Sequence, residues 1–283
     1  MWTNEYQPPK HKFQVLLSVH NGEEYLERCL KSLDDSLNHY DWILLYGDDE
    51  STDESNVVLA KQARALTCNK IHLYEYNKAK TVGEAKNRLI KESQKFKKEY
   101  PYILFMDADD EMTPERPKMA ETAENHNSQY VVGAWEKIKN NSKQIISGET
   151  TAKKLTFGPW ATLFHSNFLP EDGILFPEQE IFDTGYEDVL AWYHLKYIDK
   201  KEPTVHESNE PVHRYIIRSE SASNTQDIKT LNHNRNVFWG ISRLIKEQNR
   251  NIFTDPPDHE ETLRAKDAYI KSKEEENKSQ DPH

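Results

Sequence analysis

The chain has 283 residues, of which 36% are hydrophobic and 11% aromatic, and its formal net charge is −11. This length favours one large α/β domain, or one such domain with an appendage, and the apolar content is sufficient for a core. The acidic balance argues against a dedicated nucleic-acid binder, because such proteins neutralise phosphates with clustered Lys and Arg. It suits a protein that holds a divalent cation among carboxylates.

Cysteine usage and hydropathy favour a cytoplasmic protein. Cys29 and Cys68 are the only cysteines and both fall in predicted helices, so we expect no disulfide framework and a reducing compartment. The first twelve residues are polar, without the apolar stretch of a secretion signal, and no apolar run approaches the ~20 residues of a membrane helix. We therefore expect neither secretion by a standard signal nor insertion into a membrane.

The first half of the chain alternates predicted strands and helices. Apolar runs predict strands at residues 13–19, 42–46, 71–76 and 102–106. Helical spacing of apolar residues predicts helices at residues 23–37, from 51 to about 66, and from 82 to 96. This alternation is typical of βαβ units with right-handed crossovers, so we expect a mainly parallel sheet flanked by helices.

The second half is less regular and predicts a smaller antiparallel extension followed by helices. Strands are expected at residues 130–139, 145–146 and 211–217, and helices at 185–197 and 232–249. We expect an N-terminal extension at residues 1–12, the α/β domain at 13–225, an amphipathic helix region at 226–257, and a charged, flexible tail at 258–283. We expect this tail to be a solvated helix that frays into disorder.

The predicted helix at residues 232–249 combines an apolar stripe with basic residues. The stripe consists of Val237, Phe238, Ile241, Leu244 and Ile245, and the basic residues are Arg235, Arg243, Lys246 and Arg250. Packing of this stripe on the rest of the protein is the favoured interpretation. The alternative is that the helix lies on an anionic membrane surface, which would make the protein peripheral to a membrane.

Polar and acidic side chains follow three of the four predicted parallel strands. They are Ser18 and Asn21, Asp48 and Asp49, and Asp107 and Asp109. Ligands of open parallel sheets bind outside the carboxyl ends of the strands, although a single Asp there also serves as a turn or helix cap. Carboxylate oxygens suit Mg²⁺ or Mn²⁺, and such a cation would offset the repulsion between Asp107, Asp109 and a diphosphate.

Several short motifs stand in order along most of the chain. They are VLLSVHN at residues 15–21, DDESTD at 48–53, GEAKN at 83–87, YILFMDADD at 102–110, LF at 163–164, FPE at 176–178, YEDV at 186–189, and Arg218 with SAS at 221–223. Together they resemble the family 2 inverting glycosyltransferases, whose fold is GT-A. Two positions depart from the family pattern, since His20 stands where Tyr is usual and Glu50 replaces Gly.

The resemblance implies roles for individual residues. Nucleotide-sugar contacts are implied for Ser18, Asn21, Asp49, Lys86, Asp107, Trp160 and Arg218. Asp109 is implied as the direct metal ligand together with Asp107, and His213 is a further candidate whose alternative is a structural role. Core packing is the alternative for Trp160, and a solvated surface role is the alternative for Lys86 and Arg218.

The resemblance also places the general base at Asp188 and leaves Glu187 to contact the acceptor, although both residues also favour the start of a helix. We predict a glycosyltransferase that uses Mn²⁺ or Mg²⁺ and moves a hexose-type sugar with inversion. The donor is a nucleotide-diphosphate sugar, with UDP favoured by family frequency, and the acceptor is a hydroxyl of a glycan, a lipid-linked molecule or another compound.

Two other functions remain open. A nucleotidyltransferase that makes nucleotide-sugars shares the parallel sheet and acidic metal site. It would show a Gly-rich loop with a basic residue after the first strand, whereas residues 18–24 contain one Gly and no Lys or Arg. The other alternative is a catalytically silent module that keeps the fold and binds the nucleotide-sugar.

Overall fold

The computed structural model describes residues 10–140, 142–154, 158–178, 187–217, 228–253, 255 and 257–280. The chain forms two compact units, each assembled from separate stretches of sequence. Unit 1 comprises Met1–Ala79, Ala85–Ile174 and Pro203–Ile217, and unit 2 comprises Lys80–Glu84, Leu175–Glu202 and Arg218–His283. The α/β domain predicted at residues 13–225 therefore contributes to both units.

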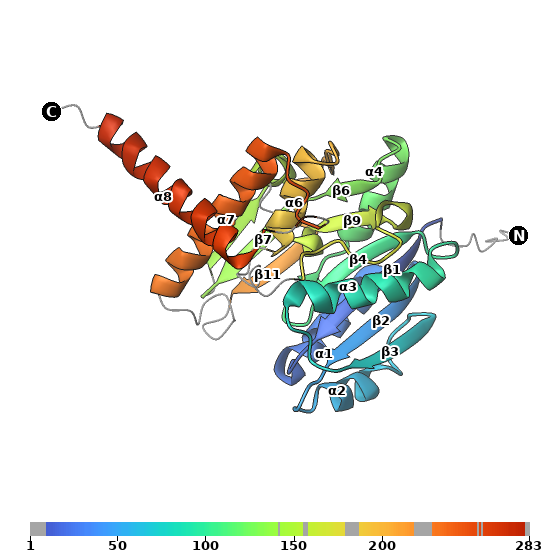
Figure 1. Ribbon diagram of the computed structural model, residues 1–283. Helices are drawn as coiled ribbons and strands as arrows, with labels where there is room; N and C mark the ends of the chain where they lie inside the picture. The colour runs from blue at the N-terminus through green and yellow to red at the C-terminus, as the bar shows by residue number, and fades with distance from the viewer. Residues whose placement is uncertain are drawn as a thin grey trace, which may run out of the picture. The chain divides into compact units, whose positions relative to one another are not determined.

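Unit 1 is built on a seven-stranded sheet with the order β10-β6-β9-β4-β1-β2-β3 (Figure 1). Its strands are β1 (Lys12–Val19), β2 (Asp41–Asp49), β3 (Lys70–Tyr76), β4 (Tyr102–Asp107), β6 (Tyr130–Val132), β9 (Thr162–His165) and β10 (Thr204–Val205). β1 to β4 run parallel to one another, and β9 is antiparallel to both of its neighbours. The predicted mainly parallel α/β architecture is thus confirmed.

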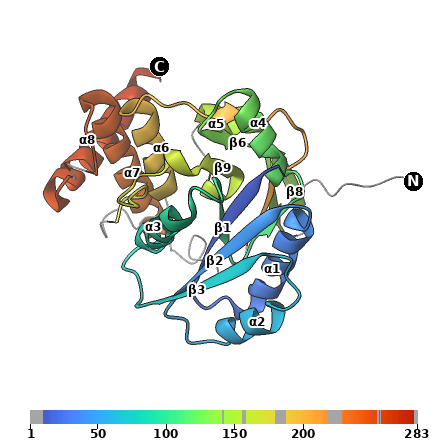
Figure 2. The ribbon, with the colours of Figure 1, turned by 90° about the vertical axis from the view of Figure 1, so that its right-hand side faces the viewer.

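The helices of unit 1 explain the apolar runs of the central strands. They are α1 (Glu23–Leu37), α2 (Ser55–Gln62), α3 (Val82–Ser93, whose first turn belongs to unit 2), α4 (Met119–Asn125), α5 (Gly148–Lys154) and the short turns η1 (Gln94–Phe96), η2 (Arg116–Lys118), η3 (Pro159–Ala161) and η4 (Ser166–Phe168). α1 and α3 cover opposite faces of β1 and β2 (Figure 2). Strands buried on both faces need continuous apolar sequence rather than alternation.

The close packing of α3 depends on a glycine in β2. A Cβ added to Gly47 would lie 3.0 Å from Leu89 Cδ2 of α3. On the other face, α1 places Leu26, Leu30 and Leu33 against the core residues of β1. The carboxyl ends of β1 and β2 are therefore held between two packed helices.

A second, four-stranded sheet has the order β5-β11-β7-β8. Its strands are β5 (Glu111–Met112), β7 (Trp135–Lys139), β8 (Ser142–Ile146) and β11 (His213–Ile217). β11 pairs antiparallel with β5 but parallel with β7, so the extension predicted as antiparallel is mixed. The strand predicted at residues 130–139 divides into β6 and β7 at Gly133, where an added Cβ would lie 2.5 Å from Val212 Cγ1.

Unit 2 contains α6 (Glu187–Tyr197), α7 (Ile228–Gln248) and α8 (His259–Gln280). The five residues of the predicted apolar stripe on α7 are each 7% exposed or less. Four of them pack in one cluster with Leu190 of α6 and with Ile252. This burial supports the favoured interpretation, in which the stripe packs on the rest of the protein, over the membrane-surface alternative. None of the described helices is long and apolar enough to cross a membrane.

The charged tail, predicted as a solvated helix, forms the 22-residue helix α8, which crosses α7 and packs on it (Figure 1). An added Cβ on Gly240 of α7 would lie 2.7 Å from the backbone of Ala265, so the two helices approach closely at this point. The Trp239 and Tyr269 rings stack with their centroids 6.2 Å apart. The close approach at Gly240 and the stacking of Trp239 on Tyr269 therefore hold α8 against α7. The low apolar content of α8 had favoured a helix exposed to solvent.

Candidate functional site

The carboxyl ends of β1, β2 and β4 bring three predicted site residues together. Ser18 is in register with Gly47 on one side and with Asp107 on the other. Side chains in register on neighbouring strands share a face of the sheet, which here is the face covered by α3. Lys86 of α3 places its Nζ atom 4.0 Å from Asp107 Oδ1, and the Lys86 side chain is only 9% exposed. Ser18, Lys86 and Asp107 thus line one position at this edge.

Asp107 to Asp110 form a tight turn directly after β4. The Asp110 amide donates to the Asp107 carbonyl at 3.2 Å. The Asp109 carbonyl accepts a hydrogen bond from the Arg28 guanidinium at 2.8 Å. Among the described residues, no group of three or more His, Cys, Asp or Glu side chains is arranged to hold a metal. Mg²⁺ is usually held by one or two carboxylates plus substrate phosphates and water, so a turn with two aspartates fits such a cation.

The loops after β1 and β2 are joined by hydrogen bonds. Asn21 Oδ1 accepts from the Thr52 amide at 2.8 Å, and the Asn21 amide donates to Ser51 Oγ at 3.0 Å. The next two amides, of Gly22 and Glu23, donate to Ser55 Oγ and Asp53 Oδ2. The Ser-Thr-Asp part of the DDESTD motif therefore fixes the neighbouring loop. Asn21, predicted as a nucleotide contact, has its amide oxygen engaged in this connection.

The two aspartates at the end of β2 have different surroundings. Asp48 is buried and accepts from the Ser51 amide at 3.2 Å and from Asn56 Nδ2 at 3.0 Å, so it shapes its own loop. Asp49 accepts from the Ala79 amide at 2.7 Å and lies 3.4 Å from an Arg88 guanidinium nitrogen. Asp49, predicted as a nucleotide-sugar contact, thus lies against the segment that precedes α3.

Glu50, which replaces the family glycine, adopts the left-handed backbone conformation that favours glycine. Its φ is +58°, and its carboxylate accepts from the Lys78 amide at 3.1 Å. The turn that the family forms with Gly is therefore kept here by a residue under backbone strain. The other unusual residue, His20, places Nδ1 2.8 Å from the Asp49 carbonyl.

His213 lies next to the acidic turn in the interior of unit 1. Its Nε2 atom is 3.0 Å from Asp110 Oδ2, and both side chains are at most 1% exposed. Burial, with a further contribution from the Arg116 charge, holds the pKa of His213 well below its ordinary value. His213 Nε2 contacts Asp110, which supports the structural alternative for His213 over the metal-ligand prediction.

Trp160 belongs to an aromatic cluster with His213. Its ring stacks on the rings of His213 and Tyr215, with centroids 4.8 Å and 5.2 Å away. Trp135 meets it edge-on at 5.0 Å. Trp160 is 9% exposed, so these contacts support the core-packing alternative over a sugar pocket.

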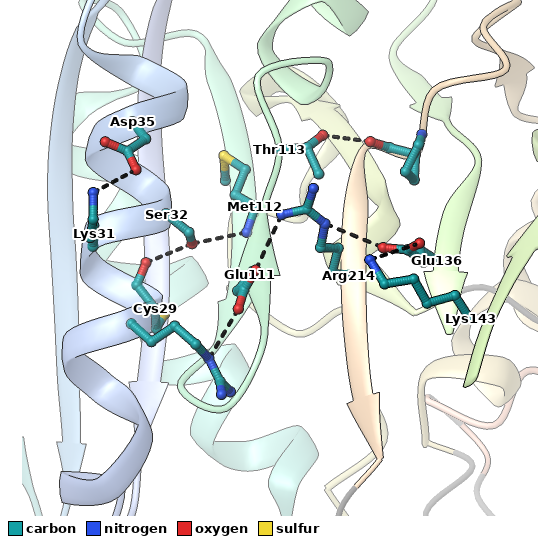
Figure 3. A network of polar contacts seen from close by, with 12 residues as sticks. Cys29, Lys31, Ser32, Asp35, Glu111, Met112, Thr113, Glu136, Lys143 and Arg214 are labelled. Atoms are coloured by element: carbon teal, nitrogen blue, oxygen red, sulfur yellow. Dashed lines mark hydrogen bonds and ion pairs between the residues drawn. The ribbon is translucent and has the colours of Figure 1, made fainter. Parts of the chain in front are cut away.

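A series of ion pairs begins at α1 and continues across the second sheet (Figure 3). Glu111 lies 3.1 Å from Arg28 Nε and 3.2 Å from an Arg214 nitrogen. Arg214 continues to Glu136 at 3.3 Å, and Glu136 to Lys143 at 3.6 Å. Partly exposed pairs of this kind contribute at most about 1 kcal/mol each. These ion pairs therefore fix the register of β5, β11, β7 and β8 more than they stabilise the fold.

Glu187 and Asp188 lie in unit 2. α6 begins at Glu187, and Asp188 Oδ1 accepts from the Val189 amide at 2.7 Å. Arg218 lies outside the described residues. The GEAKN and FPE motifs meet in this unit at Gly83 and Pro177. A Cβ added to Gly83 would lie 2.4 Å from the Pro177 carbonyl oxygen. The roles predicted for Asp188, Glu187 and Arg218 stay predictions.

Sequence reasoning missed a buried arginine beside the site. Arg116 is fully buried and donates to the carbonyls of Pro159 and Thr162 at 3.2 Å and 3.0 Å. Burial lowers its pKa to about 9, although the charges of Asp107 and Asp110 act in the opposite direction. Its only signal in the sequence is its place after the acidic motif, which is a weak one.

Comparison with known proteins assigns the family. The model of the family described as glycosyl transferase family 2 matches residues 14–184, more than half of the chain. The chain belongs to this family. Over 102 residues this family 2 chain is 28% identical to the teichoic acid poly(glycerol phosphate) polymerase of Staphylococcus epidermidis. The match covers 36% of the chain but only 13% of the polymerase.

Solved structures share the fold of this family 2 chain. TarS of S. aureus, residues 1–349 in complex with UDP-GlcNAc, matches with a TM-score of 0.63 and 18% identity, over 83% of this chain and 67% of that one. The mannosyltransferase PcManGT of Pyrobaculum calidifontis, in complex with GDP-Man and Mn²⁺, matches with a TM-score of 0.56 and 14% identity, over 94% and 72%. The predicted family and GT-A fold are confirmed.

Proposed function

We propose that this chain is a metal-dependent inverting glycosyltransferase that moves a hexose-type sugar from a nucleotide-diphosphate sugar to an acceptor hydroxyl. The observation that carries the proposal is the turn of Asp107 and Asp109 at the end of β4, next to Ser18 and Lys86. The UDP-GlcNAc and GDP-Man of the two similar structures support this class of donor. UDP is the nucleotide that we favour.

The proposed cation is Mn²⁺ or Mg²⁺, held by Asp109 and Asp107. The Mn²⁺ in the mannosyltransferase structure supports this assignment. When bound, the cation supplies positive charge that stabilises a departing nucleoside diphosphate. Lys86 lies 4.0 Å from Asp107 and adds a second positive charge where a phosphate would approach.

Asp188 is the proposed general base, with Glu187 as a contact to the acceptor. Inversion requires a group on the acceptor side that takes the proton as the hydroxyl attacks the anomeric carbon. The position of Asp188 in the first turn of α6 supports the proposal, because a helix N-terminus favours an ionised carboxylate. The acceptor itself is a glycan, a lipid-linked molecule or another hydroxyl compound.

A donor screen tests this function against its two alternatives. The protein is incubated with a panel of UDP-, GDP- and other nucleotide-sugars, with Mn²⁺, with Mg²⁺ or with EDTA, and nucleotide release is measured together with the anomeric configuration of the freed sugar. We expect slow, cation-dependent release of a nucleoside diphosphate and an inverted sugar. A sugar 1-phosphate and nucleoside triphosphate formed with pyrophosphate would identify a nucleotidyltransferase, and tight binding without turnover a silent module.

A further inference from the structure

Asp110, the residue after the proposed metal turn, is bonded to both ends of β11. Its Oδ2 atom lies 3.0 Å from His213 Nε2, and its Oδ1 atom accepts from the Ile216 amide at 2.9 Å. Its own amide donates to the Asp107 carbonyl at 3.2 Å. One residue therefore closes the turn that carries Asp107 and Asp109 and also joins it to a strand more than a hundred positions later.

Asp110 is surrounded by buried polar side chains, where apolar residues would be the usual filling of a core. Arg116 and His213 are both 0% exposed. Arg116 Nε and one terminal nitrogen, and His213 Nδ1, have no hydrogen-bond partner within the described part of the chain. Buried ionic groups of this kind are often no more stabilising than apolar side chains of similar volume. Their presence beside the acidic turn favours a role in geometry over a role in stability.

We propose that Asp110 is a positioning residue, which holds the Asp107–Asp109 turn on β11 so that both carboxylates are presented to a cation and its diphosphate. The proposal rests on the function proposed above. Its physical basis is preorganisation, because a turn fixed in advance loses less conformational freedom when the ligand binds. Residues that orient metal ligands in this way typically contribute 10- to 100-fold to metal affinity.

The side chain of Asp110 is not placed to bind a cation directly. It is 1% exposed, and both of its oxygens are engaged by β11. An Asp110→Asn substitution keeps an oxygen for the Ile216 amide and places an amide N–H within reach of His213 Nε2, whereas Asp110→Ala removes both bonds. A positioning role therefore predicts rescue by Asn, which a ligand role does not.

The chain offers a matched control in the same unit. Glu115 Oε1 lies 3.1 Å from His206 Nε2, and the two side chains are 12% and 10% exposed. This pair is also a carboxylate with a histidine, here partly buried, and it joins the residue before η2 to the segment after β10 and not to the acidic turn. Glu115→Ala thus lowers the stability of the protein by removing a carboxylate–histidine contact, as Asp110→Ala does. It leaves the bonds between Asp110 and β11 in place.

The test measures UDP binding by titration calorimetry over a range of Mn²⁺ concentrations for the parent and three variants, well below their unfolding temperatures. We expect Asp110→Ala to weaken Mn²⁺-dependent binding by at least about tenfold. Asp110→Asn and Glu115→Ala are expected to stay within about threefold of the parent. Hydrogen exchange, which needs no ligand, is expected to accelerate at the Ile216 and Asp110 amides in Asp110→Ala alone.

Three results would overturn the inference while leaving the function intact. They are parental binding by Asp110→Ala, equal losses in Asp110→Ala and Glu115→Ala, or unchanged exchange at Ile216. If Asp110→Asn and Asp110→Ala lose the same amount of UDP affinity, the positioning role is also wrong. The site would then require the negative charge of Asp110 itself. A parent protein that binds neither UDP nor GDP, with or without Mn²⁺, contradicts the proposed function, and the inference falls with it.

Discussion

Asp109 lies at the tip of the turn after β4, partly exposed, with its carbonyl held by Arg28. Asp109→Asn keeps an oxygen donor but loses the negative charge that a hard cation needs. We expect Mn²⁺-dependent UDP binding to fall by at least about a hundredfold, with the unfolding temperature unchanged because the side chain is not in the core. Calorimetry with Mn²⁺ and with EDTA checks this. Parental affinity in Mn²⁺ would remove Asp109 from the metal site.

The left-handed conformation of Glu50 leads to a prediction about stability. Glu50→Gly relieves backbone strain but frees the unfolded chain and removes the bond to the Lys78 amide, so we expect a change within about 0.5 kcal/mol. Glu50→Val suffers the strain in full and is expected to lose about 1–2 kcal/mol. Urea unfolding measures both. A Val variant as stable as the Gly variant would show that this backbone position is not strained.

At the scale of elements, Glu115 connects η2 to the segment that follows β10. Burial alone would raise its pKa, but hydrogen bonds from Lys118, Ser208 and His206 outweigh burial and lower the pKa to about 2. A depressed carboxyl pKa stabilises the fold above the unfolded value of about 4.3, and this contribution, on the order of 2–3 kcal/mol, disappears as the pH falls toward 2. We expect Glu115→Gln to unfold with a shallower dependence on pH between about 4.5 and 2.

The control for this pH experiment is Glu121→Gln, because Glu121 is an exposed carboxylate on the neighbouring helix α4. It should keep the parental slope of unfolding free energy against pH. If Glu115→Gln has the same slope as the parent, the contacts of Glu115 do not depress its pKa in solution.

The pairing of α7 with α8 depends on the small size of residue 240. A Gly→Ala change in an exposed helix stabilises by about 1 kcal/mol. At Gly240 the added Cβ would lie 2.7 Å from the Ala265 backbone, so we expect Gly240→Ala to destabilise unit 2 by about 1–3 kcal/mol instead. Thermal unfolding gives the sign directly. A stabilised variant would mean that α8 does not pack on α7 in solution.

At the scale of the whole molecule, the residues proposed for donor binding and for proton transfer belong to different units. Asp188, in unit 2, is expected to affect turnover and not donor binding. Asp188→Asn should lower the transfer rate by roughly 10²- to 10⁴-fold, the usual contribution of general-base catalysis, and leave Mn²⁺-dependent UDP affinity unchanged. Single-turnover kinetics with any accepted acceptor measure this. Near-parental transfer would require another base.

The four parallel strands β1 to β4 and the positions of their acidic ends could be predicted from the sequence, because parallel strands and amphipathic helices have strong local patterns. The membership of β6 and β10 in the same sheet could not. The division at Gly133, the parallel pairing of β11 with β7, and the pairing of α8 with α7 could not. They depend on contacts with residues distant in sequence, such as Val212 and Ala265. The contacts of Asp110 with β11 could not be predicted for the same reason, since no residue near Asp110 in the sequence points to His213.

The bond from Asp110 to the Ile216 amide has a consequence for the order in which the protein forms during synthesis. The two residues are 106 positions apart. At about 5–20 residues per second, a ribosome makes Ile216 roughly 5 to 20 seconds after Asp110. Throughout this interval β1 to β4 are available to assemble, whereas the acidic turn lacks the strand that holds it. The nascent chain therefore acquires its sheet well before it acquires a fixed pair of carboxylates.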